Sequence, residues 1–338
     1  MTMGSNVRHF GTTASGEKTL AIELAAGNLC ATVLTYGATL QDLRLADIDW
    51  SLTLGAPDIS AYEDRLRYCG AIVGPVANRI SGASADLGGA TFHFEANEAG
   101  RTTLHSGSTG THAQNWRIAE VAACSATLTL NLPDGLGGFP GNRHIRASFS
   151  LSAPATLTLD LWATSDRPTW MNLANHRYWN LDGARTIEGH RLTVPAKTYT
   201  ALRSDQTPTG QIEPVDGTNL DLRHGKYLSI LDKLDHNYCL SECTRALTGI
   251  AELQGRSGVR MRLASTQPGL QVYDGAGFGS GGIPGLTGRP YGAFSGIALE
   301  PQHWPDAPNQ PGFPSIVLEP GQTYRQCTQF RFDRVNIG

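Results

Sequence analysis

Short runs in which apolar and polar residues alternate recur along this chain and constrain its fold more than any other feature. The pattern is clear in residues 126–132 (ATLTLNL), 144–151 and 156–162 (TLTLDLW). A period of two places every second side chain on one face of a β-strand, so one face is buried and the other is solvated. Similar runs occupy residues 19–24, 29–34, 39–45, 191–194, 259–263 and 324–335. Strands at this turn-length spacing predict an all-β sandwich.

Few segments favour a helix. Residues 57–65 (PDISAYEDR) are one of them, with Asp58 available as a cap. The 338 residues include 39 Gly and 18 Pro, and only 17% are charged. Helix-rich chains contain more Glu, Lys, Ala and Leu, so this composition favours short strands joined by tight turns. We find no repeat or linker, and expect a single domain over residues 1–338. We expect about the first 15 residues to be loosely ordered.

Charge and hydropathy exclude several classes of partner. The formal net charge is -3 and the pI is about 6.4, which provides no basic surface for nucleic acid and no attraction to an anionic membrane. No apolar run is long enough to cross a bilayer, and the opening MTMGSNVRHF lacks the apolar core of a secretory signal. The six cysteines form no CxxC pair. We therefore expect reduced thiols and a cytoplasmic protein.

One glycine pattern imitates a dinucleotide-binding motif without meeting its requirements. Gly277, Gly279 and Gly282 satisfy GxGxxG after a predicted strand at residues 270–273. The residues that follow, IPGLTGRP, cannot begin a helix, and the motif needs strand, glycines and helix together. HExxH, P-loop and GxSxG motifs are also missing from the sequence. The sequence therefore contains no motif that supports a dinucleotide-binding, metalloprotease, kinase-like or serine-hydrolase function.

A carboxylate directly follows the apolar run 296–299. Behind Glu300, the chain continues with Pro301 and four more prolines up to residue 314. Proline lacks a backbone donor, so these residues exclude a helix and a central strand in this span. We predict that Glu300 lies at the end of a rigid strand and is followed by a stiff loop, a common mounting for a catalytic acid or base. The alternative for an isolated Glu is a structural role at a sheet edge.

Other polar blocks lie between the predicted strands. Asn78 and Arg79 occupy a Gly-bounded segment, residues 70–83, where the guanidinium offers several fixed donors. His105 lies at a strand-to-turn junction in TLHSG. Taken alone, Arg79 is more often part of a surface ion pair and His105 a satisfied structural histidine.

The block at residues 172–181 (NLANHRYWNL) is the most suggestive of a ligand. It surrounds His176 with asparagines and aromatic residues. Amides suit the hydroxyl groups of a sugar, and aromatic rings suit the apolar face of a pyranose. Asp235, in LDHNY, and Gln271, in GLQVY, add an acid and an amide. Together these blocks favour a sugar-binding site, although His176 alone has even odds of being structural.

In their order along the chain, these blocks resemble the aldose 1-epimerase family, the galactose mutarotases. The motifs are ANRI (77–80), LH-x-G (104–107), N-x-x-NH-x-Y-x-NL (172–181), DHN (235–237), LQ-x-Y (270–273), LE-x-Q…PDAPNQP (299–311) and PG-x-x-Y (320–324). Each is weak alone, but the ordered set is specific and extends from about residue 36 to the last strand. The resemblance implies a large antiparallel supersandwich with a sugar in a cleft on its concave face.

The resemblance also implies residue roles and an activity. Glu300 matches the general base of the family and His176 its general acid. The positions that match sugar-contacting residues are Asn78, Arg79, His105, Tyr178, Asp235 and Gln271. The implied reaction interconverts the α and β anomers of an aldohexose such as galactose or glucose, by proton transfers that require no cofactor and no metal. We further expect Asp235 and His105 to keep His176 protonated and Glu300 ionised.

Three positions depart from the family pattern. Pro75 stands where many members have Arg, Ser106 replaces the first Gly of LHGG, and Arg177 lies between His176 and Tyr178. We expect these residues to border the cleft and to affect sugar preference more than chemistry.

Alternative functions stay open beside the epimerase. The protein could be a non-catalytic carbohydrate-binding protein, or an epimerase of a pentose or of a sugar phosphate held by Arg79 and Arg177. A glycoside hydrolase would use Asp235 and Glu300 as its two carboxylates. Trp304 either covers one edge of the sugar or packs against the Pro-rich loop. The expected partner is a monosaccharide, and either a monomer or a homodimer fits the sequence.

Overall fold

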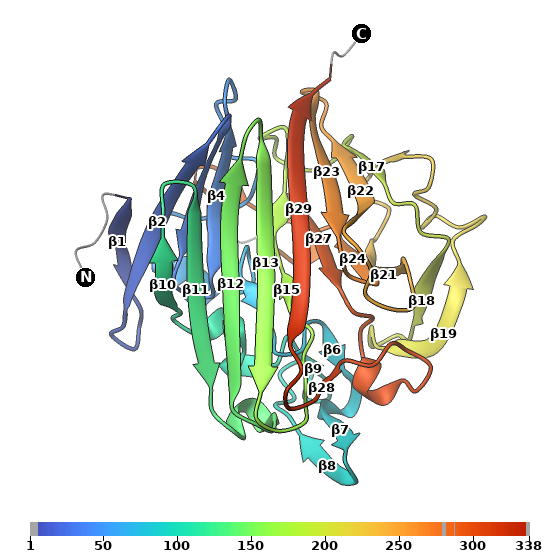
Figure 1. The fold of residues 1–338 in the computed structure, drawn as a ribbon. Helices are drawn as coiled ribbons and strands as arrows, with labels where there is room; N and C mark the ends of the chain where they lie inside the picture. The colour runs from blue at the N-terminus through green and yellow to red at the C-terminus, as the bar shows by residue number, and fades with distance from the viewer. Residues whose placement is uncertain (1–5, 279–281, 287, 336–338) are drawn as a thin grey trace.

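The computed structural model describes residues 6–278, 282–286 and 288–335, and strands dominate it (Figure 1). The largest sheet has nine strands, which run in the order β10 (Arg117–Val121), β11 (Ser125–Leu132), β12 (Arg143–Ser152), β13 (Thr156–Ser165), β29 (Tyr324–Arg334), β23 (Val259–Ser265), β22 (Thr248–Gln254), β17 (Arg191–Thr193) and β20 (Lys226–Tyr227). Neighbouring strands in this sheet are antiparallel.

Two further sheets complete the sandwich. The six-stranded sheet runs β16 (Tyr178–Trp179), β27 (Ile297–Gln302), β24 (Gly269–Tyr273), β21 (Asp235–Cys239), β18 (Thr198–Leu202) and β19 (Pro208–Pro214). The four-stranded sheet runs β1 (Val7–Thr12), β2 (Lys18–Ala26), β3 (Leu29–Leu34) and β4 (Thr39–Leu45). Both are antiparallel. The prediction of an all-β antiparallel sandwich is therefore confirmed.

Short ribbons and turns connect the sheets. The two-stranded pairs are β5 (Ile72–Val73) with β15 (Ala174–Asn175), β6 (Arg79–Ile80) with β9 (Thr103–Leu104), β7 (Ser84–Leu87) with β8 (Ala90–His93), β14 (Thr169–Trp170) with β28 (Val317–Leu318), and β25 (Ile283–Pro284) with β26 (Pro290–Tyr291). The 3-10 helices are Ser81–Ala83, Gly107–Thr109, Thr111–Ala113, Leu136–Gly138, Ala276–Phe278 and Ala307–Asn309. Gly279, part of the GxGxxG pattern, lies outside the described residues.

The predicted helix is shorter than expected. Helix α1 covers Ile59–Glu63, and Asp58 occupies the N-cap position without a capping bond from its side chain. The helix stops at Asp64, whose φ of -124° and ψ of -103° are not helical. Only Ile59 and Tyr62 are buried, so one turn is as much as packing supports.

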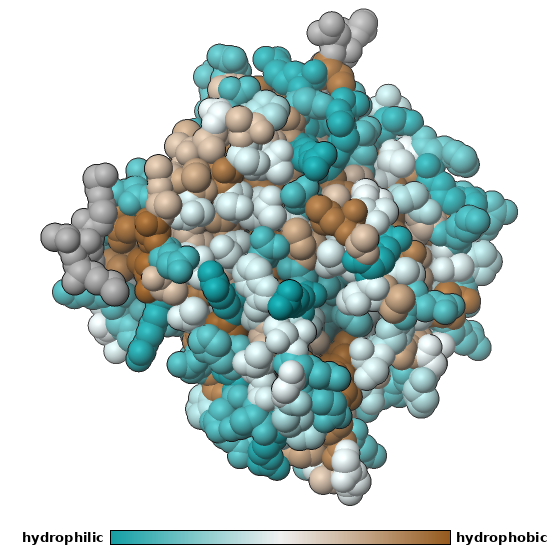
Figure 2. All heavy atoms as spheres, viewed as in Figure 1, coloured by the Kyte–Doolittle hydropathy of each residue, from teal (hydrophilic) through white to brown (hydrophobic). Residues whose placement is uncertain are grey.

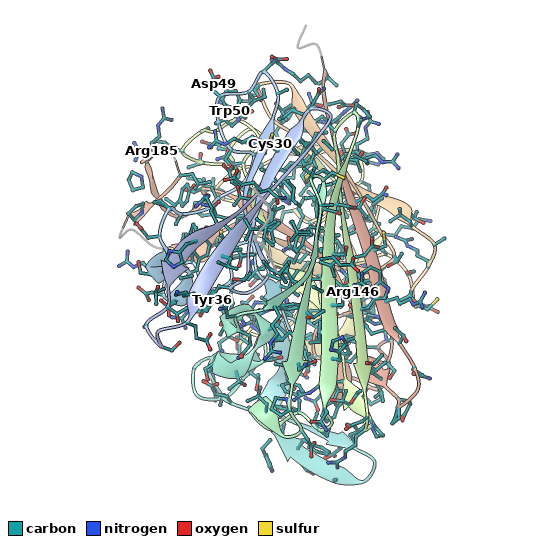
Figure 3. The ribbon with its side chains drawn as sticks, turned by 60° about the vertical axis from the view of Figure 1, so that its left-hand side comes forward. Cys30, Tyr36, Asp49, Trp50, Arg146 and Arg185 are labelled. Atoms are coloured by element: carbon teal, nitrogen blue, oxygen red, sulfur yellow. The ribbon has the colours of Figure 1, made fainter. Side chains whose placement is uncertain are left out.

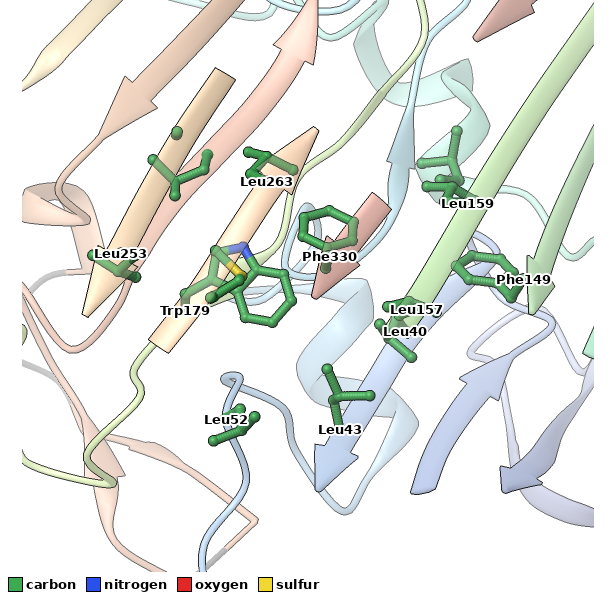
Figure 4. Packing of buried hydrophobic residues seen from close by; sticks show 14 of the residues in the cluster. Leu40, Leu43, Leu52, Phe149, Leu157, Leu159, Trp179, Leu253, Leu263 and Phe330 are labelled. Carbon is green, nitrogen blue, oxygen red and sulfur yellow. The ribbon is translucent and has the colours of Figure 1, made fainter. Parts of the chain in front are cut away.

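The alternation seen in the sequence separates core from surface. Leu157 and Leu159 of β13 point inward, and Leu40 of β4 reaches the same core from the four-stranded sheet (Figure 4). Trp179 of β16 packs on Phe330 of β29 with ring centroids 5.0 Å apart, which joins the six-stranded sheet to the nine-stranded one. The core therefore lies between the large sheet and the two smaller ones.

The outer face of the nine-stranded sheet carries the other half of each alternating run. In the space-filling view this face is covered mainly by hydrophilic and neutral residues (Figure 2). Arg146 is exposed there, with its guanidinium 5.4 Å from the ring centroid of Trp162 (Figure 3). Within the described ranges, the structure contains no helix whose length and apolarity would let it cross a membrane. All six cysteines are described, and none forms a disulfide.

Two local predictions need correction. The N-terminus is not loosely ordered from residue 7 onward, because β1 pairs with β2 and Phe10 packs on Tyr62 at 6.2 Å. The strand before Glu300 does not end there, because β27 continues to Gln302 and pairs Pro301 with Leu270 of β24. The carbonyl of Pro301 accepts a bond from the side chain of Gln326, so its backbone polar atoms point away from β24 and the missing N–H breaks no ladder bond.

Candidate active site

The eight residues singled out in the sequence line one cavity of about 770 Å³. They are Asn78, Arg79, His105, His176, Tyr178, Asp235, Gln271 and Glu300. This volume suits a small molecule, for which pockets typically measure about 300–1,000 Å³. The residues come from segments that are distant along the chain, so only the tertiary structure brings them together.

The six-stranded sheet delivers the floor of the cavity through its register. Glu300 on β27 lies opposite Gln271 on β24, and Tyr273 on β24 lies opposite Asp235 on β21. Directly paired residues of antiparallel strands project from the same face. The intervening residues point to the other face and enter the core, where they are Leu270, Val272, Ile297 and Leu299. Alternation within these strands therefore separates a polar cavity from an apolar core.

His176 and Glu300 face each other at this floor. The distance from His176 Nε2 to Glu300 Oε1 is 3.7 Å, slightly beyond a hydrogen bond. Both side chains are buried, at 5% and 2% exposure for the two residues. His176 Nδ1 and Glu300 Oε2 have no hydrogen-bond partner in the described part of the chain. A carboxylate and an imidazole thus converge on one point with spare bonding capacity.

Burial sets the protonation of this pair. It lowers the pKa of His176 to about 4. It also raises the pKa of Glu300 well above its usual value, an effect that Asp235 increases and Arg79 opposes. Burial therefore disfavours both charged forms, the imidazolium of His176 and the carboxylate of Glu300. The expectation that Asp235 and His105 favour imidazolium and carboxylate is wrong, because desolvation outweighs the neighbouring charges and Asp235 repels a second carboxylate.

Polar contacts among Arg79, Asp235 and their neighbours fix one wall of the cavity. Arg79 forms two bonds with Glu98, Nε to Oε2 at 2.8 Å and Nη2 to Oε1 at 2.9 Å, and its Nη1 lies 3.6 Å from Asp235 Oδ2. Gln271 donates from Nε2 to Asp235 Oδ1 at 2.6 Å. Burial alone would lower the pKa of Arg79, but the partners Glu98 and Asp235 outweigh it and raise it. Burial conversely raises the pKa of Asp235 despite Arg79.

Asn78 and His105 are held together by their backbones. The amide of His105 donates to the carbonyl of Asn78 at 2.9 Å, and the amide of Asn78 donates to His105 Nδ1 at 3.1 Å. Both residues have left-handed φ values, 62° for Asn78 and 52° for His105. Burial, followed by the charges of neighbouring His176, His112 and Arg79, lowers the pKa of His105 well below normal. A neutral His105 that accepts at Nδ1 carries its proton on Nε2.

Sequence reasoning missed three aromatic residues of the cavity and the acid that pairs with Arg79. Tyr68, Tyr273 and Phe278 line the cavity, as does Glu98. The ring of Tyr178 lies 4.5 Å from Phe278 and 6.1 Å from Tyr273. Only Tyr273 had a signal, its place in LQ-x-Y, whereas the other residues stand in no motif.

Several residues near the motifs lie outside the cavity. Trp304 is buried against Phe313, with centroids 5.2 Å apart, and its indole donates to Pro268 O at 3.2 Å. It therefore packs the Pro-rich loop. Pro75, Ser106 and Arg177 are buried and do not line the cavity either, which corrects the expectation that they border it. Within the described ranges, no cluster of three or more His, Cys, Asp or Glu is arranged around a metal-sized position.

Comparisons with known proteins agree with this geometry. A family model described as aldose 1-epimerase matches residues 21–331. The chain is 33% identical to the galactose mutarotase of Mus musculus, over 96% of this chain and 97% of that protein. It is 28% identical to the aldose 1-epimerase of Escherichia coli, over 90% and 92% of the two chains. The crystal structure of an aldose epimerase homologue from C. elegans superposes with a TM-score of 0.87 at 30% identity, covering 94% of this chain and 99% of that one.

Proposed function

The chain belongs to the aldose 1-epimerase family, and from this premise we propose that Glu300 and His176 interconvert the α and β anomers of an aldohexose as general base and general acid. The protein is a carbohydrate isomerase, a mutarotase. We propose galactose or glucose as its substrate, since the relatives include galactose mutarotases.

Ring opening needs two proton transfers, one at each of the two oxygens attached to C1. A base removes the proton of the C1 hydroxyl while an acid protonates the ring oxygen, and the bond between C1 and that oxygen breaks. The open aldehyde rotates about C1–C2, and the ring closes on the other face with the two roles reversed. Both oxygens are attached to C1, so acid and base must converge on a single point. The 3.7 Å separation of His176 Nε2 and Glu300 Oε1 is the observation that carries the proposal.

Before the reaction, Glu300 and His176 together hold the one exchangeable proton that the reaction needs. A protonated Glu300 beside a neutral His176 holds one proton, as does the ion pair of carboxylate and imidazolium. A hydroxyl of the bound sugar can donate to Glu300, and a hydrogen bond to the charged form lowers the pKa of a carboxyl group. Sugar binding would thus favour transfer of the shared proton from Glu300 to His176. Glu300 would then be the ionised base and His176 the protonated acid.

The remaining residues would bind and orient the sugar. Arg79, Asp235 and Gln271 form a fixed array of donors and acceptors beside Glu300. Fixed amide and carboxylate groups suit pairs of sugar hydroxyls. The cluster of Tyr178 and Phe278 offers a ring surface for the apolar face of a pyranose.

The two arginines considered as holders of a sugar phosphate are not available for that role. Arg79 already forms a bidentate pair with Glu98, and Arg177 is fully buried away from the cavity. Neither side chain is free to hold a phosphate as the phosphate hypothesis requires. None of the six cysteines, all of them described, forms a disulfide, and on this ground we further propose a cytoplasmic location. We also propose that the whole chain forms one domain.

Polarimetry of freshly dissolved α-galactose tests this function. The wild-type protein should accelerate the approach to equilibrium, and Glu300→Gln or His176→Asn should each reduce kcat by about 10²- to 10⁴-fold. Sugar binding by these variants, measured by calorimetry, should persist. A wild-type protein that binds galactose without accelerating mutarotation would instead be a binding protein. Release of reducing sugar from an aryl galactoside would point to a hydrolase.

A further inference from the structure

Arg177 is a buried cation with an incomplete set of hydrogen bonds, and its guanidinium carbon lies 5.7 Å from the ring centroid of Trp179. The residue is 0% exposed and lies behind the cavity wall, next to His176 in the chain. Its Nη2 donates to the backbone oxygens of Leu40, at 2.6 Å, and Gly70, at 3.2 Å. Nε and Nη1 have no hydrogen-bond partner among the described residues. Burying an incompletely paired cation is expensive, so its retention calls for a role.

Arg177 donates to a backbone junction at which residues 70–71 are bonded to residues 175–177, and His176 is part of this junction. The carbonyl of Gly70 accepts two further bonds, from Asn175 Nδ2 at 2.8 Å and from the amide of Leu40 at 3.0 Å. The backbones are joined as well, because the amide of Gly70 donates to His176 O at 2.8 Å and that of His176 donates to Ala71 O at 2.9 Å. The residues on both sides of His176 thus bond through their side chains to the same carbonyl.

This junction determines where Tyr68 lies. Gly70 has a φ of +76°, and a Cβ at this position would come within 2.6 Å of Leu40 O, so the chain has little freedom here. Two residues earlier, the ring of Tyr68 enters the cavity wall. It stacks on His176 with centroids 6.0 Å apart and an angle of 22°. It also contacts His105, at 4.7 Å between centroids.

Packing, and not a hydrogen bond, orients the imidazole of His176. A reactive histidine is usually aligned by a bond from its second ring nitrogen. Here Nδ1 has no such partner in the described part of the chain. The ring instead lies between Tyr68 and Tyr178, whose centroids are 6.0 Å and 5.0 Å away. Displacing Tyr68 would leave His176 without one of the surfaces that aim Nε2 at Glu300.

We propose that Arg177 is a positioning residue that anchors Gly70 and thereby holds the ring of Tyr68 against His176. This inference rests on the proposed role of His176 as the general acid. The guanidinium acts through backbone carbonyls and makes no contact with the sugar. Its effect should appear in kcat, because a misaligned acid slows proton transfer more than it weakens binding.

The first experiment replaces Arg177 and a matched arginine. Arg143 is also buried, at 1% exposure, also lies outside the cavity lining, and also donates to backbone carbonyls, those of Gly141 at 3.0 Å and Pro133 at 2.6 Å. Neither of these carbonyls is near His176 in the chain. Arg177→Met should lower kcat by about 10- to 100-fold with KM changed less than about threefold. Arg143→Met should lower stability but keep kcat per folded molecule. Arg177→Lys, which keeps a donor, should recover part of the loss. Equal kcat for the two Met variants would overturn the proposal.

A double-mutant cycle then tests the route through Tyr68. Tyr68→Ala should also lower kcat, and the double variant Tyr68→Ala with Arg177→Met should be no slower than the worse single variant. Multiplying effects would show that Arg177 acts independently of Tyr68 and would refute the proposal. Full activity of His176→Asn would refute the proposed role of His176 as the general acid. Hydrogen exchange of backbone amides would still test whether Arg177 anchors Gly70. Arg177→Met should speed exchange of the Gly70 and His176 amides, while Arg143→Met should not.

Discussion

At the scale of single residues, the site depends on how far Glu300 and His176 are removed from water. Burial raises the pKa of the Glu300 carboxyl and lowers that of the His176 imidazole, so it favours the neutral form of each group. The neutral pair costs less free energy in a low-dielectric cavity than an ion pair would. The chemistry nevertheless requires the ion pair, so binding of sugar hydroxyls must provide part of the stabilisation.

The pH dependence of kcat/KM should reflect these shifted values. Activity should be lost on the acid side below about pH 4, the pKa of His176, because a second proton there removes the base. On the alkaline side it should fall above the raised pKa of Glu300, where neither group retains a proton to donate. Polarimetric rates across pH, corrected for the uncatalysed reaction, measure both limbs. An acid limb near 6.5, the ordinary imidazole pKa, would contradict this account.

Glu300→Gln should stabilise the protein above the ordinary pKa of a glutamate while abolishing activity. The folded-state pKa of Glu300 is raised, so the unfolded chain loses this proton first and the native state loses stability as pH rises. A neutral amide removes that penalty, which we expect to be about 1–3 kcal/mol once pH exceeds the folded pKa. Urea unfolding at acidic and alkaline pH measures the free energy of unfolding. A gain that did not grow with pH would exclude this explanation.

At the scale of elements, the pairing of β24 with β27 sets the positions of Glu300 and Gln271 in the cavity. Gln271 and Glu300 are opposite each other, and two residues away Gly269 is opposite Gln302. A Cβ at Gly269 would lie 2.5 Å from Asn237 Oδ1 and 3.0 Å from Gln302 O. A side chain at this position would collide first with the amide of Asn237 on β21, so the packing around β24 favours glycine here.

Gly269→Ala should destabilise the fold and reduce activity together. The added methyl must displace the side chain of Asn237 and press on the backbone of Gln302, and overpacking of this kind costs about 1–3 kcal/mol. Gly249→Ala is the matched control, because Gly249 also lies in a strand, β22, and a Cβ there has no atom within 4 Å. Thermal unfolding and polarimetry measure both variants. If the two alanine variants behaved alike, the contact at Gly269 would not matter.

At the scale of the whole molecule, Trp179 joins the layers that carry the site. Its ring is fully buried and packs on Phe330 at 5.0 Å and Phe332 at 5.7 Å, both from the opposite sheet. Its neighbour Tyr178 points the other way, into the cavity. One short strand, β16, thus contributes to the core on one face and to the site on the other.

Trp179→Ala should cost about 3–5 kcal/mol of unfolding free energy, the usual range for a large aromatic residue in a core. Trp179→Phe should cost clearly less, because it keeps an aromatic contact and removes an indole N–H that has no partner among the described residues. Chemical denaturation measures both. A comparable loss in the two variants would mean that ring volume does not determine the stability at this position.

Much of the architecture followed from local patterns. The runs at residues 29–34 and 39–45 match β3 and β4 residue for residue, because a period of two is a property of the chain itself. The strand through Glu300 was underestimated, since Pro301 is tolerated where its backbone faces away from β24. That tolerance depends on a neighbouring strand, which no local pattern reports.

The amino-acid sequence was sufficient to predict an antiparallel β-sandwich and a set of polar residues that line one cavity. Their order along the chain was enough to identify the set. Only the folded structure reveals that Glu98 pairs with Arg79, that Tyr68 stacks on His176, and that burial raises the pKa of Glu300. The physical reason is that burial and partner choice arise from contacts between segments distant in the chain, whereas alternation arises within each strand.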